Sequence, residues 1–352
     1  MRKLKLYLIS ACFLLSSSSI LAQTESKLAW LDSLSPSERQ ARLVEAAKKE
    51  GQVVTYANLD VSGAKALADG FMKKYPSVKL QMVHFSGASI INRIETEARA
   101  GKVGADVIMS GQLGLLALLD KKIVARYRSP QRDSYREGFK DKEGLWTALF
   151  TNLMVTSYNT RFVKKEEAPR SLDDLLSPRW KGKLAMDTQS YVWFGAILQH
   201  MGEEPGIRFM KKLNEQNPTH IRGRRHMNEL LAAGEFEMAV ETNLNSVLTL
   251  SELGAPLWFA PIRPLFLSPS LLSMSQNGPH PHAGALVMDY LLSEEGQRIV
   301  VSINRMPAHA RVKPKESYLL EGMDVRVPDV FDIGTRYNAL GRRYREIFPG
   351  SN

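Results

Sequence analysis

Polar and charged residues gather in six short stretches of this chain, each after a run predicted to form a buried strand. In the first half these residues are Asn58 and Asp60, then Ser86, Gly87 and Ser89, then Ser110, Gly111 and Gln112. In the second half they are Asp187, Gln189, Ser190 and Tyr191, then Arg224 and Arg225, then Thr242, Asn243 and Asn245. Ligands of parallel α/β sheets bind outside the carboxyl ends of the strands, beside the N-termini of helices. Hydroxyl, amide and guanidinium groups placed there predict a cleft that holds a polar ligand by hydrogen bonds.

Each of these residues also has an ordinary structural role that the sequence leaves open. The turn 86–89, read as Ser-Gly-Ala-Ser, contacts a ligand or simply caps the helix that follows it. The polar run after Asp187 lines a cleft or forms solvated surface. The cluster Arg222–Arg225, with Gly223 inside it, binds an anion by bidentate hydrogen bonds or forms a charged face. Trp193 and Phe194, on the next predicted helix, are assigned to the core.

The chain contains no pattern typical of a catalytic or metal centre. His280 and His282 flank Pro281 in what we interpret as the turn that begins a helix, without the helical spacing and neighbouring carboxylate of a zinc enzyme. Neither a Gly-x-Ser-x-Gly elbow nor a phosphate-binding Gly-Lys-Ser/Thr loop is present. We therefore assign no catalytic residue, no metal ligand and no cofactor.

The N-terminus has the pattern of a secretory signal peptide. Three basic residues among the first five precede an apolar and serine-rich run at 6–20, and Ile20-Leu21-Ala22 is a suitable cleavage site. Cleavage after Ala22 predicts a protein exported to the periplasm. The alternative is a lipoprotein, because residues 9–12, Ile-Ser-Ala-Cys, match a lipidation box at Cys12. Cys12 is the one cysteine, so a chain cleaved after Ala22 has neither a disulfide nor a thiol nucleophile.

Length and charge favour a soluble protein of two compact units. The chain has 352 residues, and its formal charge of +10 falls to +7 when the three basic residues of the signal are removed. This excess permits attraction to anions without indicating nucleic-acid binding. No later segment is long and apolar enough to predict a membrane span.

Hydrophobic periodicity predicts strands that alternate with helices, as in parallel sheets of βαβ units. The predicted strands cover residues 53–57, 78–85, 105–109, 183–186, 219–221 and 238–241. The predicted helices cover residues 36–50, 64–75, 90–100, 191–201, 204–215, 227–232, 282–292, 294–302 and 330–347. Pro-rich residues 258–264 are expected to return the chain to the first unit.

Several ordered motifs give the chain a resemblance to a known family. Residues 171–186, SLDDLLSPRWKGKLAM, lie between Tyr158-Asn159 and the polar run after Asp187. Residues 93–101, RIETEARAG, precede Ala105-Asp106-Val107, and residues 231–235 and 291–297 read LAAGE and LLSEEGQ. This order resembles the solute-binding proteins of ABC importers, in the branch that includes the ferric-iron binders. The motifs span residues 53–301.

The resemblance implies a two-lobed α/β fold, the type II periplasmic-binding-protein fold, with each lobe a mainly parallel sheet flanked by helices and a cleft between them. Its lobes would comprise residues 23–157, 158–257 and a return through 258–310, with a C-terminal helical tail at 311–352 of unassigned lobe. Family members that bind iron use paired tyrosines after the strand corresponding to residues 238–241. Here that stretch reads Glu241-Thr242-Asn243-Leu244-Asn245, which lacks the phenolates that hard ferric iron prefers.

We therefore expect a monomeric periplasmic receptor that captures a small polar, anionic organic solute by hinge closure and delivers it to an ABC permease in the inner membrane. The alternatives are a protein that binds ferric iron or an iron chelate through unusual ligands, a ligand-sensing subunit of a receptor, and an enzyme built on the same scaffold.

Overall fold

The computed structural model describes residues 23–85, 87–101, 103–315, 317 and 321–351. The predicted signal peptide, its cleavage site after Ala22, Cys12 and Ser86 lie outside the described residues. The first helix of the described residues, α1, covers Gln23–Leu28. Its buried Thr24 donates from its hydroxyl to the Ser275 carbonyl at 2.9 Å, which fixes α1 to the body of the protein.

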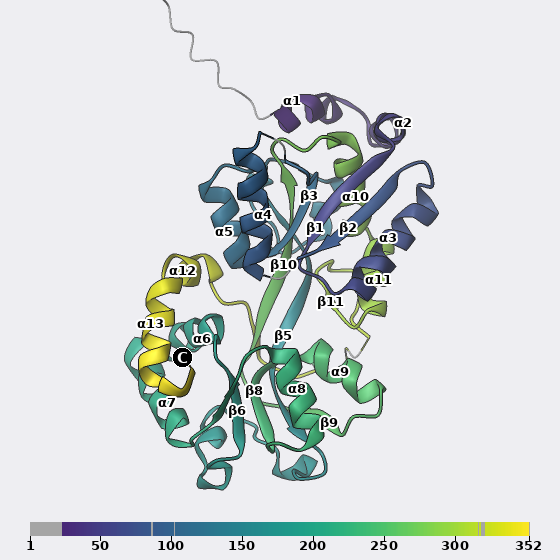
Figure 1. The fold of residues 1–352 in the computed structure, drawn as a ribbon. Helices are drawn as coiled ribbons and strands as arrows, with labels where there is room; N and C mark the ends of the chain where they lie inside the picture. The colour runs from purple at the N-terminus through teal and green to yellow at the C-terminus, as the bar shows by residue number, and fades with distance from the viewer. Residues whose placement is uncertain (1–22, 86, 102, 316, 318–320, 352) are drawn as a thin grey trace, which may run out of the picture.

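The first lobe is built on three parallel strands in the order β2-β1-β3, so these strands end on the same side. Helices α10 and α3 pack beside this sheet, and α2 packs on α10 (Figure 1). The elements are α2 (Pro36–Glu50), β1 (Gln52–Ala57), α3 (Val61–Lys74), β2 (Lys79–His84), α4 (Gly87–Arg99), β3 (Val107–Gly111), α5 (Gln112–Asp120) and β4 (Val124–Ala125). The helices α10 (Pro281–Leu292) and α11 (Glu294–Ser302), and the strand β11 (Met306–Pro307), come from later in the chain.

Two long antiparallel strands connect the lobes. β5 (Thr147–Asn159) leaves the first lobe and β10 (Leu265–Ser275) returns to it. The two pair with each other from Phe266 opposite Met154 to Leu272 opposite Thr147. β10 also pairs with β3, and the far end of β5 pairs with β8 of the second lobe. One continuous sheet therefore runs through both lobes (Figure 1).

The second lobe repeats the parallel arrangement, with β8, β6 and β7 side by side. The elements are β6 (Leu184–Asp187), α6 (Tyr191–Met201), α7 (Glu203–Glu215), β7 (Thr219–Ile221), α8 (Arg224–Ala233), β8 (Met238–Asn243), α9 (Leu244–Glu252) and β9 (Leu257–Ala260). β9 pairs with the end of β5. After the proline-rich segment 258–264, β10 runs to β3 of the first lobe.

The two lobes have separate hydrophobic cores. Phe71, Ile94 and Leu286 belong to the core of the first lobe. In the second lobe one core lies between the sheet and α6 and α7, and contains Phe194 and Met210. Another lies on the side of α8 and α9. The two-lobed α/β fold predicted from the sequence is thus confirmed, while the lobe limits at residues 157 and 257 stay predictions.

The C-terminal tail contacts both lobes. It contains β12 (Val325–Arg326), α12 (Val330–Thr335) and α13 (Tyr337–Ile347), and β12 pairs with the start of β10. α12 packs against α5 of the first lobe and α6 of the second, while α13 packs on α6 and α7. Phe331 of α12 packs against the cores of both lobes.

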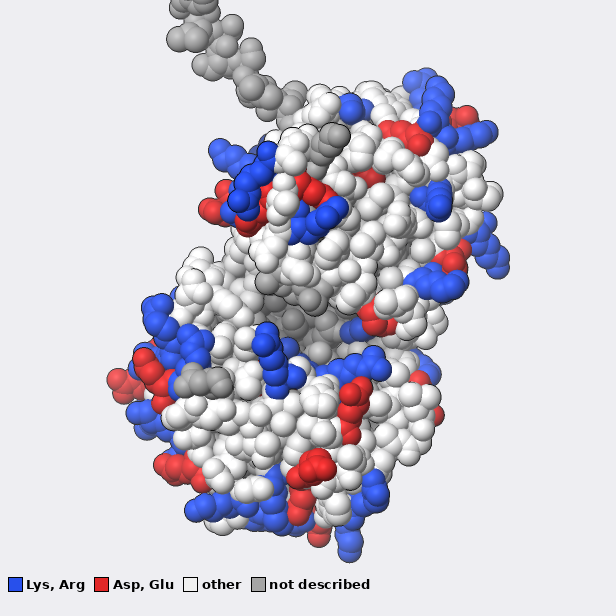
Figure 2. Space-filling view, viewed as in Figure 1, with Lys and Arg blue, Asp and Glu red and all other residues white. Residues whose placement is uncertain are grey.

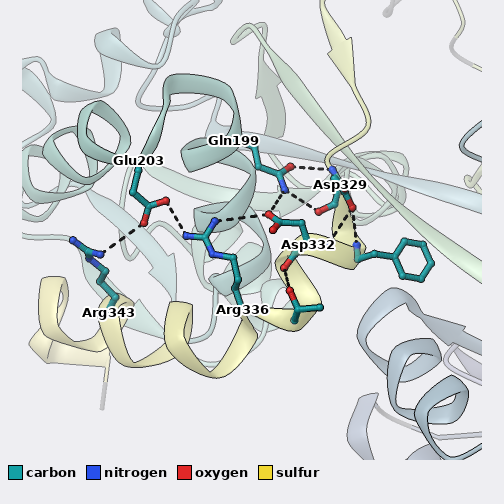
Figure 3. Close-up of polar contacts among 8 residues, drawn as sticks. Gln199, Glu203, Asp329, Asp332, Arg336 and Arg343 are labelled. Atoms are coloured by element: carbon teal, nitrogen blue, oxygen red, sulfur yellow. Dashed lines mark hydrogen bonds and ion pairs between the residues drawn. The ribbon is translucent and has the colours of Figure 1, made fainter.

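Polar contacts join the tail to the second lobe (Figure 3). The Gln199 amide donates to the Asp329 carbonyl at 2.8 Å and accepts from the Asp329 N–H at 2.9 Å. Arg336 pairs with Glu203 at 2.8 Å, and Arg343 approaches the other oxygen of Glu203 at 3.7 Å. The tail is therefore fixed to the second lobe by hydrogen bonds and ion pairs, while its contacts with α5 are apolar.

Candidate functional site between the lobes

The carboxyl ends of the parallel strands in both lobes carry the predicted site residues. β1 and β3 lead to Asn58 and to Gly111, and β6 and β8 lead to the loops at Asp187 and Asn243. The surface is hollowed between the two lobes, and basic side chains lie at the lower edge of this hollow (Figure 2). The position of the predicted residues therefore follows the strand-end rule.

A cavity of about 500 Å³ lies in this region and is lined from both lobes. We call it the interlobe cavity. Its polar lining includes Asp60, Ser62 and Arg305 from the first lobe and Arg225, Asn243 and Asn245 from the second. Four of the predicted residues, Asp60, Arg225, Asn243 and Asn245, are thus brought together across the lobes.

Arg305 and Asp60 form the first-lobe side of the interlobe cavity. Asp60 caps α3 by accepting from the Gly63 N–H at 2.9 Å, and it pairs with Arg305 at 3.1 Å. Burial raises the pKa of Asp60, but hydrogen bonds from Ser62 and Gly63 and the charge of Arg305 outweigh it and lower the pKa overall. Burial lowers the pKa of Arg305. Asp60 is therefore ionised at neutral pH and balances the charge of Arg305.

Arg305 also joins the first-lobe side of the interlobe cavity to the connecting strand β5. Its guanidinium donates to Asn152 of β5 at 2.7 Å and lies 5.3 Å from the ring centre of Phe150. Arg305 is not among the predicted site residues, because it follows a helix, α11, and the strand-end rule does not select such positions. The signal that the sequence offered was three polar residues at the end of a predicted helix, Ser302, Asn304 and Arg305.

The second-lobe side of the cavity presents unused donors and acceptors. Asn243 precedes α9 without a capping hydrogen bond, and its side chain has no hydrogen-bond partner within the described part of the chain. The buried Oδ1 of Asn245 likewise has no partner there. Among the described residues Arg225, near the start of α8, pairs only with Glu229 of its own helix, at 3.1 Å, and it is largely exposed. These groups are free to bind a ligand between the lobes.

Asn304 and Glu252 join the two lobes beside this cavity. The Asn304 amide, after α11, donates to Glu252 of α9 at 2.8 Å. Lys315 also pairs with Glu252. The lobes are therefore in polar contact in this structure.

Arg224 forms an ion pair inside the protein with a buried acid, Glu241, instead of facing a ligand with a free guanidinium. Both its Nε and its Nη2 donate to Glu241 at 2.7 Å, and Glu241 also accepts from the Ser190 hydroxyl at 2.6 Å. Burial raises the pKa of Glu241, and the charge of Arg224 offsets this only in part. Glu241 also adopts a positive φ of 61°, a conformation that is strained for a residue with a side chain.

Other predicted residues of the second lobe are used within the protein. Asp187 accepts from the backbone N–H groups of Gln189 and Gly223 at 2.7 and 2.9 Å. The hydroxyl of Tyr191 accepts from Arg345 at 2.8 Å. Buried Thr242 contacts the Val155 carbonyl at 3.3 Å and the Ser157 hydroxyl at 3.2 Å. The side chain of Gln189 is exposed.

The remaining first-lobe residues divide among different roles. The Asn58 amide, oriented to suit its neighbours, donates to the Met109 carbonyl and accepts from the Gly111 N–H, so it joins β1 to β3. Gly87 begins α4 and Ser89 lies in its first turn. Ser110 and Gln112 are buried, and each has a polar atom, Oγ and Nε2, without a hydrogen-bond partner among the described residues. Gln112 lines a different cavity from the interlobe one.

The two histidines near the start of α10 contact single carboxylates. His280 lies 3.1 Å from Asp106, and His282 lies 2.7 Å from Glu50. The described residues contain no group of three or more histidines, cysteines or acids that could hold a metal ion. Over the same residues, no helix has both the length and the apolar character needed to cross a membrane.

Comparisons with known proteins agree with this architecture. The family described as bacterial extracellular solute-binding protein matches residues 104–330, well over half of the chain. The Fe(3+)-binding periplasmic protein of Serratia marcescens is 24% identical over 202 residues, which cover 56% of this chain and 58% of that protein. A putative 2-aminoethylphosphonate-binding periplasmic protein of Salmonella typhimurium is 21% identical over 297 residues, 79% of this chain and 86% of that protein.

A solved structure shows the same fold. The periplasmic binding protein AfuA of Actinobacillus pleuropneumoniae, with exogenous fructose 6-phosphate bound, superposes with a TM-score of 0.71 at 20% identity. The match covers 84% of this chain and 98% of AfuA. These relatives are named for different solutes, so the fold alone does not decide which ligand this chain takes.

Proposed function

The chain belongs to the bacterial extracellular solute-binding protein family, and from this premise we propose that it is the substrate-binding component of an ABC importer. In this proposal the mature protein is a periplasmic monomer. It captures a small polar, anionic organic solute between its lobes and delivers it to a permease in the inner membrane.

The observation that carries the proposal is the interlobe cavity. Asp60 and Arg305 line it from one lobe, and Arg225, Asn243 and Asn245 line it from the other. A ligand that contacts both sets stabilises the closed arrangement of the lobes in proportion to its preference for that arrangement. Closure of this kind, about a pair of connecting strands, is how two-domain proteins trap a solute.

The charges around the cavity favour an anion. Arg305 is already balanced by Asp60, while Arg225 is held only by an exposed pair with Glu229. The neutral amides of Asn243 and Asn245 add hydrogen-bonding groups. Of the similar proteins, one is named as a putative 2-aminoethylphosphonate-binding protein, and AfuA was solved with exogenous fructose 6-phosphate bound. Ferric iron prefers anionic oxygen ligands, of which Asp60 supplies one. A small organic anion therefore suits the cavity better than iron.

Thermal unfolding and small-angle scattering test the proposal. We expect one of 2-aminoethylphosphonate, fructose 6-phosphate or another small organic anion to raise the melting temperature and reduce the radius of gyration. A ligand present at a hundred times its Kd stabilises the folded state by about 2.7 kcal/mol. Native mass spectrometry of the freshly purified protein would identify a solute that it retains.

Variants connect the response to the cavity. The double variant Arg225→Gln with Asn243→Ala should lose both responses and keep the melting temperature of the free protein. The matched control is Arg208→Gln, since Arg208 is an exposed arginine of α7 whose ion pair is also within its own helix. If ferric citrate gives the response and organic anions do not, the ligand class is wrong. If the double variant binds as tightly as the parent, the cavity assignment is wrong.

A further inference from the structure

A second cavity, of about 310 Å³, lies where the start of α5 meets the beginning of the C-terminal tail. We call it the tail cavity. It shares no lining residue with the interlobe cavity. It is bounded by Gln112 of α5, by Lys140 and Trp146 before β5, by Leu271 of β10 and by Val327 and Phe331 of the tail.

Gln112 provides an unused donor at this cavity. Gln112 is 5% exposed, and its amide nitrogen Nε2 is buried without a hydrogen-bond partner among the described residues. Leaving a buried donor unsatisfied costs about 1–3 kcal/mol. Buried polar groups are usually paired with protein, water or a ligand. An acceptor atom of a ligand in this cavity would satisfy the Gln112 amide.

The other polar groups around the tail cavity favour an anionic acceptor. Lys140 uses one of its three ammonium protons to reach the Arg132 carbonyl at 2.9 Å, which leaves donors for a ligand. Of the described residues in the lining, Asp329 alone is acidic, and its Oδ1 accepts from the N–H groups of Phe331 and Asp332 at 3.1 Å. Donors are therefore available here, whereas the carboxylate already caps α12.

The rest of the lining is apolar and partly aromatic. Trp146 is 7% exposed, and its ring centre lies 5.9 Å from that of Phe331 at an angle of 32°. Leu271 and Val327 add aliphatic surface, and Val327 is 44% exposed, so the cavity reaches solvent beside the tail. A volume of this size is about twice that of a cavity of roughly 150 Å³ that holds benzene.

From these observations we propose that the tail cavity is a second binding site, for a small aromatic carboxylate. The carboxylate accepts from the Gln112 amide and the Lys140 ammonium, and the ring packs on Trp146, Phe331 and Leu271. This site is distinct from the interlobe cavity, so it is independent of the solute proposed above. Because Val327 and Phe331 belong to the tail, occupation also holds the tail against α5.

Calorimetric titration with indole-3-acetate as the probe tests the proposal. We expect binding at low-millimolar concentration or tighter, and much weaker binding of 3-methylindole, which lacks the carboxylate. Gln112→Met keeps the length of the side chain and removes the donor, so it should weaken binding by about tenfold, the loss of one hydrogen bond to a charged group. Lys140→Met should weaken it to a similar degree.

Hydrogen exchange and control variants complete the test. Bound indole-3-acetate should slow amide exchange in residues 327–331, and Arg225→Gln, in the interlobe cavity, should bind the probe as the parent does. If Gln112→Met does not fold, Gln112→Glu replaces it in the test. The negative charge that this substitution adds repels the carboxylate of the probe, so binding should be weaker. The proposal is overturned if the probe does not bind, if the Gln112 variants bind it unchanged, or if protection falls on residues 242–245 instead. Absence of binding would mean that the tail cavity holds water only.

Discussion

Gly334 of α12 lies directly against Leu116 of α5. A Cβ atom added to Gly334 would stand 1.8 Å from the Leu116 Cδ1, well inside any van der Waals contact. Leu116 belongs to the first lobe, whereas α12 is joined to the second lobe through Gln199. At this point the tail therefore packs on the first lobe through an apolar contact between α12 and α5.

The first prediction concerns this contact. Gly334→Ala forces Leu116 to move, and overpacking of this kind lowers the free energy of unfolding by about 1–3 kcal/mol. The better helix propensity of alanine offsets roughly 1 kcal/mol of this loss. Leu116→Ala removes the obstacle, so we expect the double variant to be more stable than the sum of the single effects predicts. Urea unfolding of the four proteins measures the coupling, which should exceed about 0.5 kcal/mol. Strict additivity would show that α12 and α5 do not touch in solution.

The second prediction concerns the ion pairs of the tail. Glu203→Gln removes the partner of both Arg336 and Arg343 (Figure 3). These side chains are partly exposed, so we expect a loss of less than about 1 kcal/mol that shrinks further at high salt. Faster limited proteolysis within residues 330–347 should accompany it. The matched control is Glu204→Gln, because Glu204 pairs only with Arg208 of its own helix. Equal proteolysis of the two variants would contradict a role for Glu203 in holding the tail.

The third prediction concerns the ion pair between half-buried Arg224 and buried Glu241. Removal of one partner from a buried ion pair costs about 3–5 kcal/mol, because the other charge stays buried and unpaired. Arg224→Met should therefore destabilise the protein strongly at neutral pH. It should also raise the pKa of Glu241 further, since Arg224 is its largest lowering influence.

The pH dependence of Arg224→Met has a definite sign. A carboxyl group whose pKa is higher in the folded than in the unfolded protein binds more protons when folded. Its stabilising contribution is present below the unfolded value near 4.5 and is lost as the pH rises through the folded value. The variant should therefore lie closest to the parent in stability at about pH 4–5 and fall behind as the pH increases. Urea unfolding at several pH values measures this, and a constant difference would contradict it.

Local patterns predicted most elements because the physics that forms them is local. Helix α6 and strand β7 have the limits that periodicity predicts, Tyr191–Met201 and Thr219–Ile221. Helix α3 begins at Val61 rather than near residue 64, because the Asp60 carboxylate caps it. Ser35 is the residue before α2, and its hydroxyl donates to Glu38 at 2.8 Å rather than accepting from a helix N–H group.

The details of the candidate site depend on partners that are remote in the sequence. Ser190 meets Glu241 across 51 positions, and Asp60 meets Arg305 across 245. No periodicity or turn signal carries such pairings. The sequence therefore located the strand ends, but it could not tell Asn243, which has no side-chain partner in the described residues, from Thr242, which is used internally.

The last prediction concerns the balance of charge between Asp60 and Arg305. Asp60→Asn keeps an oxygen that can cap α3 and removes the counter-ion of Arg305, so the interlobe cavity becomes more positive. Arg305→Met removes the cation and leaves Asp60 negative. If an anion binds in this cavity, the two variants must change its affinity in opposite directions. With methylphosphonate as the probe, we expect tighter binding by Asp60→Asn and weaker binding by Arg305→Met, each by about fivefold to tenfold, equivalent to roughly 1–1.4 kcal/mol.

Two further measurements, the free energy of unfolding and the pKa of Asp60, distinguish an electrostatic change in anion affinity from damage to the fold. Arg305→Met also leaves Asn152 without its donor, so a loss of about 2 kcal/mol is expected. In the parent the pKa of Asp60 lies below its ordinary value near 3.8, so its contribution is present above that pH and is lost as the pH falls through the lowered value. Arg305→Met should raise the pKa of Asp60, which a carbon-13 NMR titration of its carboxyl group measures. If both variants weaken methylphosphonate binding, the loss is structural, and the anion does not sense the charge of this pair.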